Sequence, residues 1–441
     1  MLKRKMMDYL LSWKQTKNQE CLLIKGARQV GKTYIVQQFA SENYAAENYI
    51  ELNFLLRPEL IPLFSGDLSV DDLLLNLSAF FPGKVFTAGK TLLFFDEIQK
   101  CPQARTSLKA FALDNRYDVI ASGSLLGLHF GQDVEVEEEI SSIPVGYEKQ
   151  ITMFPLDFEE FLWAKRVEPH IIQHLNDCFS KAEKVPDELN SLIEQYLREY
   201  MVVGGMPAPV QVFISENNYS KVHEEQEKIL ASYSDDIVRH APKTEKQKVK
   251  KVFDSIPRQL AKENKKFQYS AVEARTNARK YGNAVQWLFD SNLAYQCNNL
   301  SLPEFPLNAY IRDDYFKLYL NDPGLLTAMY GFDMKAAILT QSLTGPIKGG
   351  IYECLIASQL ASKGDLLVYY KPDENDQEIE FVISRKANII PIEVKAKKGE
   401  TKSLNTFIEK RHPLIAYKLI SGNVGKADTK ITLPHYMIMF I

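Results

Sequence analysis

The chain has 441 residues, of which 45% are hydrophobic and 25% charged, and its formal net charge is −3. This length exceeds one typical hydrophobic core, so two or three domains are expected in a globular protein. The charge argues against a uniformly basic nucleic-acid binder but leaves room for a local basic face. No apolar run is long enough to span a bilayer, which predicts a cytoplasmic protein without membrane contact.

The first segment, "MLKRKMMDYLLSWKQ", combines basic residues with an apolar stripe. It lacks the long apolar centre and the cleavage site of a signal peptide, so an amphipathic helix is expected. The five cysteines are scattered and form no C-x-x-C pair. This pattern indicates reduced thiols, and it predicts neither a disulfide framework nor a zinc site.

A complete phosphate-loop motif follows a short apolar run. Residues 26–33 read G-A-R-Q-V-G-K-T and match G-x-x-x-x-G-K-[ST]. The predicted nucleotide-binding residues are Gly26, Ala27, Arg28, Gln29, Val30, Gly31, Lys32 and Thr33. Backbone N–H groups of such a loop surround phosphate oxygens, Lys32 would reach the β- and γ-phosphates, and Thr33 would ligate Mg²⁺. The motif therefore predicts ATP and Mg²⁺ as ligands.

Two acidic residues stand where a second strand of the sheet ends. Residues 91–95 form an apolar run typical of a strand buried on both faces, and Asp96 and Glu97 follow it. Ligands of open α/β sheets bind at this carboxyl edge. We expect Asp96 to hold Mg²⁺ through water and Glu97 to polarise the attacking water.

A third apolar segment, 119–121, ends in Ser122, Gly123 and Ser124. In P-loop ATPases with an extra strand, that strand lies between the loop strand and the acidic strand. Ser122 or Ser124 would then contact the γ-phosphate or the water. A simple turn at the end of the strand is an equally good interpretation of these residues.

With these motifs in place, the chain resembles prokaryotic AAA-type P-loop ATPases that carry an uncharacterised C-terminal region. The segments "ITMFPLDFEEFL", "VVGGMPAPV" and "YFKLYLNDPGLLTAM" extend the resemblance over nearly the whole chain. It implies an α/β fold in three parts: a P-loop parallel sheet, a helical and winged-helix region, and an α/β core like that of restriction endonucleases. We place these parts at residues 1–165, 166–335 and 336–441.

One feature of the family is missing. Related sequences often have Gly-Arg before the strand that leads to P-L-x-x-x-E-F, whereas here Tyr147 follows Gly146. Arg28, Arg105 and Arg116 remain candidates for an arginine that stabilises the transferring phosphate, and a neighbouring subunit is an alternative source. A homo-oligomeric ring is consistent with the resemblance, and the missing arginine weakens that inference.

The middle of the chain reads as helical between residues 157 and 240, followed by a basic run at 243–251. Helices at 270–274 and 283–290 and a strand at 293–297 are the layout of a winged helix-turn-helix. Arg275, Arg279 and Lys280 would then meet DNA phosphates. A packing module or a protein-binding surface is the alternative that we favour at this stage.

The C-terminal part contains a second group of acidic residues. Strands are expected at 378–383 and 388–394, with Glu393 and Lys395 on one face of the second strand. Together with Glu380 and the helical Glu353, this pattern resembles the PD-(D/E)xK nuclease fold, in which carboxylates hold Mg²⁺ and a lysine assists the attack of water. Glu380 replaces the usual Asp, and we favour an inactive scaffold over cleavage.

Three functions follow from this sequence. The first is an ATPase that uses ATP and Mg²⁺ to switch or drive its C-terminal domains on DNA or on a protein partner. The second is an ATP-controlled Mg²⁺ nuclease that uses Glu353, Glu380, Glu393 and Lys395. The third is a nucleotide-sensing scaffold without catalysis. We favour the first, because its motifs are the most complete.

Overall fold

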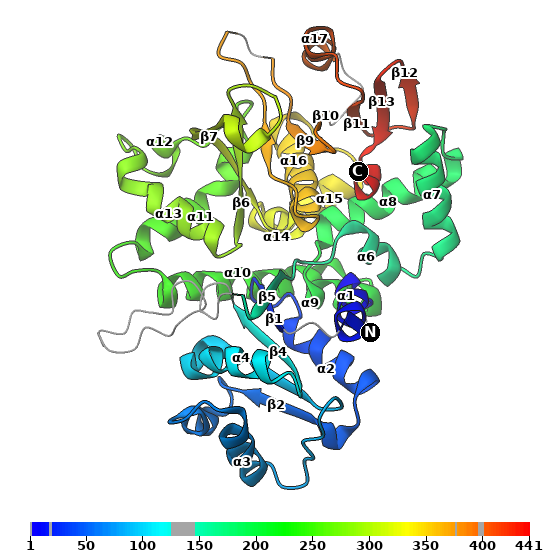
Figure 1. The fold of residues 1–441 in the computed structure, drawn as a ribbon. Helices are drawn as coiled ribbons and strands as arrows, with labels where there is room; N and C mark the ends of the chain where they lie inside the picture. Colours follow the sequence, from blue (N-terminus) through cyan, green and yellow to red (C-terminus); the bar gives the residue numbers. More distant parts are fainter. Residues whose placement is uncertain (1, 17–19, 125–145, 375–376, 396–400) are drawn as a thin grey trace.

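The computed structural model describes residues 2–16, 20–124, 146–374, 377–395 and 401–441. Figure 1 shows an N-terminal α/β layer, a central row of helices and a C-terminal α/β part in chain order. This arrangement confirms the expected order of a P-loop sheet, a helical region and a further α/β region. Within the described ranges, none of the helices combines the length and apolar composition that a membrane span requires.

The N-terminal sheet has five parallel strands in the order β2-β3-β4-β1-β5. Their bounds are β1 Cys21–Gly26, β2 Tyr49–Asn53, β3 Leu92–Asp96, β4 Asp118–Ser124 and β5 Glu148–Thr152. The strand that ends at Ser122–Ser124 therefore lies between the loop strand and the acidic strand, as expected. Parallel alignment brings the carboxyl ends of β1, β3 and β4 to one edge of the sheet.

Helices cover both faces of this sheet because successive strand residues point to opposite sides. The bounds are α1 Lys5–Thr16, α2 Lys32–Asn43, α3 Val70–Phe80 and α4 Pro102–Asp114. Leu22 and Phe94 share one apolar cluster with α1 and α2. Leu23 and Phe95 share the other with α3 and α4. Every residue of β3 is buried, which agrees with its continuous apolar run.

Five helices follow the sheet, which confirms the helical interpretation of residues 157–240. They are α6 Phe158–Ala164, α7 Pro169–Lys181, α8 Asp187–Val203, α9 Pro207–Glu216 and α10 Tyr219–His240. Short 3-10 segments also occur at η1 Ala46–Asn48, η2 Pro58–Phe64, η3 Ile98–Lys100, η4 Leu307–Tyr310 and η5 His435–Phe440. Helix α10 extends beside the N-terminal sheet, so its end lies close to the phosphate loop (Figure 1).

The next region contains three helices and an antiparallel hairpin. The elements are α11 Lys246–Leu260, α12 Tyr269–Val272, α13 Ala278–Asp290, β6 Ala294–Leu300 and β7 Ile311–Leu320. The sequence predicted the two shorter helices and the strand near these positions. Helix α12 is only one turn long, and α13 begins five residues earlier than expected, at Ala278, because Asn277 caps its first turn.

The C-terminal part joins helices to a mixed sheet of order β12-β13-β11-β10-β9. The bounds are α14 Pro323–Met329, α15 Asp333–Leu339, α16 Gly345–Ser362, β8 Val368–Tyr369, β9 Phe381–Arg385, β10 Asn388–Lys395, α17 Lys402–Arg411, β11 Ala416–Ile420, β12 Gly425–Ala427 and β13 Lys430–Pro434.

One strand prediction in this part needs correction. The first strand starts at Phe381 rather than residue 378, and Glu380 precedes it, because its side chain turns to the backbone N–H of Val394 and to Lys395. The last segment is a strand only to Pro434, after which the chain turns into the η5 helix. Pro434 has no N–H group to continue the ladder.

Two glycine motifs lock the N-terminal and C-terminal halves together. Leu156 donates its N–H to the carbonyl oxygen of Gly205 at 2.7 Å, and Gly205 donates to Asp322 at 2.6 Å. A Cβ on Gly205 would lie 2.0 Å from the Leu156 oxygen, and a Cβ on Gly324 would lie 2.4 Å from the Gly204 nitrogen. Only glycine permits this approach, which explains both "VVGGMP" and "NDPGLL".

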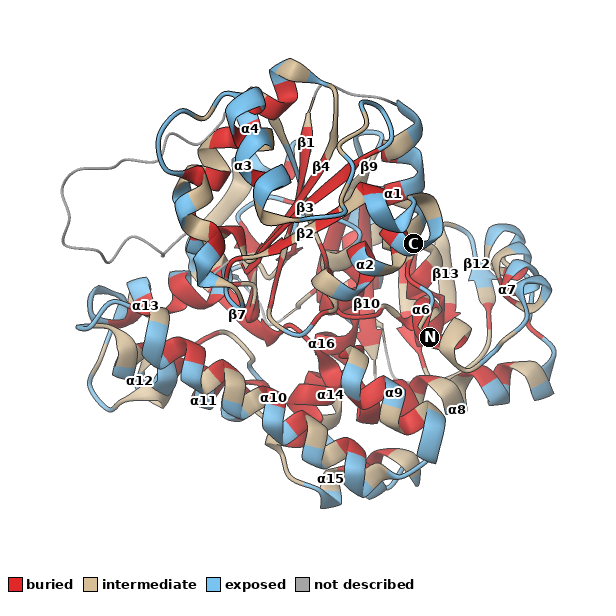
Figure 2. Cartoon of the chain, turned by 90° about the horizontal axis from the view of Figure 1, so that it is seen from below, coloured by how far each residue is buried: buried red, intermediate tan, exposed pale blue. Residues whose placement is uncertain are grey.

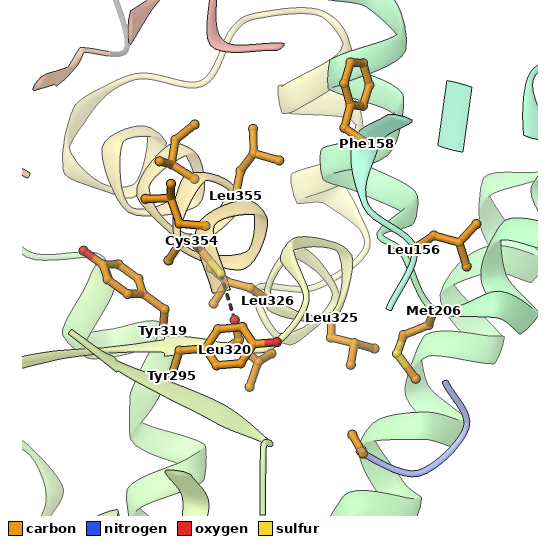
Figure 3. Close-up of a cluster of buried hydrophobic side chains, with 14 of the residues drawn as sticks. Leu156, Phe158, Met206, Tyr295, Tyr319, Leu320, Leu325, Leu326, Cys354 and Leu355 are labelled. Carbon is orange, nitrogen blue, oxygen red and sulfur yellow. Dashed lines mark hydrogen bonds between the residues drawn. The ribbon is translucent and has the colours of Figure 1, made fainter. Parts of the chain in front are cut away.

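Around these contacts the buried side chains form a continuous core. Figure 2 shows that central strands such as β1, β3 and β4 are buried while the helices carry exposed residues on the outside. Figure 3 shows apolar side chains from separate elements converging at this junction, among them Leu156, Met206, Tyr295, Leu325 and Leu355. The Cys354 thiol donates to the Leu320 carbonyl at 3.3 Å within it. A close-packed core of this kind transmits strain, so a displacement in one half is passed to the other.

Candidate nucleotide-binding site

The phosphate loop connects β1 to α2 at the carboxyl edge of the sheet. Gly31 caps α2 with φ 95°, and Gln29 also has a positive φ of 63°. A Cβ on Gly26 would lie 2.3 Å from the carbonyl oxygen of Met153. The loop is therefore a close-packed turn that leads into a helix N-terminus, where backbone N–H groups favour an anion.

Lys32 is buried at the base of this loop. Its Nζ donates to the carbonyl oxygens of Gly26 at 3.1 Å and Ala27 at 2.8 Å. Burial lowers the pKa of Lys32 to about 8, although Glu97 and Asp96 nearby favour its charged form. Phosphate oxygens would replace the two carbonyls as acceptors and strengthen the interaction, because a charged acceptor binds an ammonium more tightly.

Asp96 is the centre of a polar cluster at the end of β3. Its carboxylate accepts hydrogen bonds from Thr33 Oγ1 at 3.0 and 3.1 Å, from Asn53 Nδ2 at 2.8 Å and from the Ser122 hydroxyl. Burial raises its pKa, while the hydrogen bonds from Ser122 and Thr33 act in the opposite direction. Ser122 thus contacts the acidic strand directly, and Ser124 is buried at the end of β4.

Glu97 follows Asp96 at the carboxyl edge of the sheet, next to the phosphate loop. It is half-buried beside the loop and adopts a left-handed backbone with φ 55°, which is uncommon outside glycine. Gln99 Nε2 donates to its carboxylate at 2.5 Å. Glu97 lines a cavity of about 730 Å³ together with Lys32 and Thr33. Its carboxylate therefore lies in the same space as the phosphate-binding groups.

Helix α10 supplies residues that sequence reasoning missed. Ser232, Arg239 and His240 line the same cavity, and Arg28 Nη1 lies 2.5 Å from Asp236 Oδ1. Burial lowers the pKa of His240, and the neighbouring Arg28, Lys100 and Arg239 act in the same direction. These residues lie in the segment "SDDIVRH", which carries no local motif that points to the phosphate loop.

The other two arginines proposed for phosphate stabilisation lie elsewhere. Arg105 Nη2 pairs with Glu148 at 2.9 Å, and Arg116 pairs with Asp71 and Asp114. Neither lines the cavity. In the described residues, Arg28 and Arg239 are the arginines that line the cavity beside the phosphate loop.

A second cavity of about 330 Å³ adjoins the first. The two share Gly31 and Tyr34, and the second is bounded by apolar side chains that include Ile35, Met153 and Pro207. Concave apolar spaces of this size suit a planar base. A nucleotide with its phosphates in the larger cavity and its base in the smaller one would extend past Gly31.

The residues at the head of the loop fit a magnesium ion. Thr33 and Asp96 place one hydroxyl and one carboxylate side by side, and both are oxygen donors that Mg²⁺ prefers. In the part of the chain that the structure describes, no three His, Cys, Asp or Glu side chains gather to hold a metal by themselves.

The acidic residues of the C-terminal part are buried and paired with lysines. Glu353 accepts from Tyr319 at 2.7 Å, and it pairs with Lys265 at 3.0 Å and Lys317 at 3.1 Å. Burial raises its pKa, but these cations outweigh that effect and hold the pKa of Glu353 at about 2. Both carboxylate oxygens of Glu353 are therefore occupied by protein groups.

Glu380, Glu393 and Lys395 do come together. Lys395 lies 2.9 Å from Glu380 and 3.6 Å from Glu393, and Glu380 also accepts from the N–H of Val394 at 3.0 Å. Burial raises the pKa of Glu380 to about 7. Lys395 thus pairs with two carboxylates, while neither oxygen of the buried Glu393 has a hydrogen-bond partner among the described residues.

Comparisons with known proteins agree with the fold. Residues 18–162 match the family described as an AAA domain. Residues 194–336 and 348–432 match two families described as domains of unknown function, DUF8612 and DUF4143. No curated protein matches the chain.

Among solved structures, the Walker-type ATPase of Pyrococcus abyssi is 14% identical over 75% of this chain and 96% of its own, with a TM-score of 0.47. DnaA from Aquifex aeolicus with bound AMPPCP is 12% identical over 65% of this chain and 88% of its own, with a TM-score of 0.29. The Pif1 helicase of Candida albicans is 14% identical over 43% of this chain and 47% of its own, with a TM-score of 0.25.

A parallel sheet with a phosphate loop after β1, an acidic strand and an intervening strand defines the P-loop class of nucleotide-binding proteins. The N-terminal part of this chain is an AAA-type P-loop ATPase domain, and the two matched regions of unknown function follow it.

Proposed function

We propose that this protein binds ATP with Mg²⁺, hydrolyses it, and uses the change in bound phosphate to alter the position of its C-terminal regions. The observation that carries this proposal is the cluster around Asp96. Thr33, Ser122 and Asn53 hold its carboxylate beside the phosphate loop, with Glu97 next to it in the cavity.

Each residue has a distinct role in this proposal. Lys32 exchanges its loop carbonyls for the β- and γ-phosphates, and Thr33 and Asp96 would hold the metal ion. When bound, Mg²⁺ neutralises the charge that develops on the phosphates. Glu97 orients and polarises the attacking water, and Ser122 fixes Asp96 in place. Arg239, which lines the cavity, stabilises the transferring γ-phosphate.

The smaller cavity supports a purine base in this proposal. Its wall is mainly apolar and it shares Gly31 with the phosphate cavity, so a flat ring would lie next to Tyr34 and Met153. These apolar contacts would bury the ring without hydrogen bonds to the polar atoms at its edge. Discrimination between adenine and guanine would therefore be modest, and competition by GTP is a direct measure of it.

Helix α10 is the route by which hydrolysis would reach the rest of the molecule. Its end contributes Arg239 and His240 to the cavity, and only residues 241–245 separate it from α11. Its other contacts include α9 and α14. A change in phosphate occupancy that moves the end of α10 would therefore be passed to α11 and the elements packed on it.

The test is steady-state ATP hydrolysis with Mg²⁺ by the wild type, Glu97→Gln and Lys32→Ala, with Glu47→Gln as a matched control at an exposed site. Glu97→Gln should keep ATP affinity and lose at least about 100-fold in turnover. Lys32→Ala should lose binding itself. If the wild type binds ATP without any turnover, a nucleotide-sensing scaffold replaces this proposal.

A nuclease is the weaker alternative, because Glu353 is already paired with Lys265 and Lys317. Incubation of the wild type and Lys395→Ala with DNA, ATP and Mg²⁺ separates the two functions. Cleavage by the wild type that is lost in Lys395→Ala, with ATP turnover unchanged, would establish the nuclease.

A further inference from the structure

Positive charge is concentrated in one stretch of the chain. Residues 243–280, all of which the structure describes, contain twelve Lys or Arg and four Asp or Glu, a net charge of +8. The whole chain carries −3. The remaining residues are therefore strongly acidic, and the segregation gives this region an electrostatic character of its own.

Much of this charge lies on the surface of α11. Lys250, Lys251 and Arg258 are exposed, while the apolar positions of the same helix, such as Val252 and Phe253, are buried. The three cations fall within one side of the helix because their spacing follows its 3.6-residue period. Figure 2 shows exposed residues along the outer side of α11–α13.

The charge continues from α11 to the start of α13. Glu273 pairs with Lys251 at 2.8 Å and also with Lys280, so the two helices share one acidic side chain. Arg275 and Arg279 are exposed beside them and, among described residues, make no ion pair. We define the basic surface by its exposed members: Lys250, Lys251, Arg258, Arg275, Arg279 and Lys280.

The surroundings of the basic surface offer little to an apolar partner. Val238 and Phe289 are exposed at the two ends of this stretch, and between them, where the structure describes every residue, no other large apolar side chain is exposed. Insertion into lipid or docking of a hydrophobic peptide requires such side chains. A partner whose negative charge repeats along its length matches the surface better.

We propose that the basic surface binds duplex DNA through its phosphate backbone. Helix α11 has 15 residues and spans about 22 Å, so its cations can follow several phosphates, which repeat every ~1.7 Å of duplex axis. Arg279 and Lys280 stand at the first turn of α13, a convex element. The B-form major groove is about 12 Å wide and admits a helix, whereas the A-form groove of RNA does not.

The location connects this surface to the nucleotide. Residues 241–245 alone separate α11 from the end of α10, which lines the phosphate cavity. An effect of ATP on the affinity for DNA rests on the proposed function, whereas DNA binding itself does not. Binding is therefore measured first without nucleotide. DNA binding can then be tested even if the protein does not hydrolyse ATP.

The experiment is fluorescence anisotropy of a labelled 20-base-pair DNA duplex with the full chain. The double variant Arg275→Glu/Arg279→Glu should weaken binding at least about tenfold and lower the slope of log affinity against log salt by roughly 2. Lys228→Glu/Lys410→Glu makes the same change in net charge at exposed sites outside the surface, and it should bind as the wild type does. Thermal unfolding confirms that both variants are folded.

Three results would overturn the proposal. One is a wild type that fails to bind the duplex at low salt. Another is equal loss of affinity in the two double variants, which would make the effect one of net charge alone. The third is binding of single-stranded DNA, duplex RNA or phosphatidylserine vesicles as tightly as duplex DNA, since each would identify a different partner.

Discussion

The guanidinium of Arg28 in the phosphate loop lies 2.5 Å from the carboxylate of Asp236 on α10. The Asp236 side chain is fully buried, whereas that of Arg28 is partly exposed to the cavity. Burial raises the pKa of Asp236 to about 6, with Arg28 and Arg239 acting in the opposite direction. The ion pair thus connects the nucleotide site to α10 and places a negative charge next to the phosphate position.

Removal of that charge should improve nucleotide binding. Asp236→Asn frees Arg28 for the phosphates and removes a repulsion, so ATP affinity should rise about fivefold, which corresponds to an ion pair of ~1 kcal/mol. Titration calorimetry with a non-hydrolysable ATP analogue measures the affinity of the wild type and of Asp236→Asn.

The neighbouring Asp235→Asn is the matched control, because Asp235 is exposed on the same helix. Its affinity should stay within twofold of the wild type. Equal or weaker binding by Asp236→Asn would mean that the ion pair only stabilises the loop.

Arg239 should matter more for hydrolysis than for binding. Loss of one cation that faces the transferring phosphate typically costs about 100-fold in turnover. Arg239→Ala should therefore lower kcat by roughly that factor while the affinity for ATP changes little. Arg116→Ala should leave both unchanged, because Arg116 pairs with surface acids away from the cavity. Equal kcat values for the two variants would remove Arg239 from the mechanism.

The contrast between Arg239 and Arg116 shows how much of the site could be predicted from the sequence. The phosphate loop, Asp96 and Glu97 were predicted because each lies at the end of a strand or the start of a helix, where a local sequence pattern marks it. Arg239 was missed because its place in the cavity depends on the return of α10 to the sheet. No local pattern in "SDDIVRH" encodes that long-range packing.

The same limit applies to the C-terminal acids. The spacing of Glu393 and Lys395 correctly predicted that they share a face. The partners of Glu353 were not predicted, because Lys317 and Tyr319 come from β7 and Lys265 from the segment after α11. The lysines that pair with Glu353 are therefore set by long-range packing, which the local sequence pattern does not encode.

Substitution of Gly205 should be far more damaging than that of another glycine. Gly205→Ala forces a Cβ within 2.0 Å of a backbone oxygen, and overpacking of this kind costs about 1–3 kcal/mol. Gly282 lies within α13 with no atom near an added Cβ, so Gly282→Ala should stabilise the helix by ~0.5–1 kcal/mol. In thermal unfolding, the Tm of Gly205→Ala should fall and that of Gly282→Ala should rise. A lower Tm for both variants would refute the packing argument.

The buried Glu353 cluster predicts how stability depends on pH. The folded pKa of about 2 lies below the ordinary value of 4.5, so the ionised side chain stabilises the fold fully above pH 4.5. That contribution is lost as the pH falls from 4.5 towards 2. Glu353→Gln removes it at every pH and leaves Lys317 buried with less compensation, at a cost of about 3–5 kcal/mol near neutral pH.

Urea unfolding of the wild type and Glu353→Gln at pH 7 and pH 3 measures this dependence. The difference in unfolding free energy should be large at pH 7 and clearly smaller at pH 3, because at pH 3 the carboxyl of Glu353 is protonated in the unfolded state but still mostly ionised in the fold, and releasing that proton on folding offsets part of the stabilisation. Glu374→Gln is the control, since Glu374 is exposed. A difference that is unchanged between the two pH values would show that Glu353 is not stabilised by its lysines.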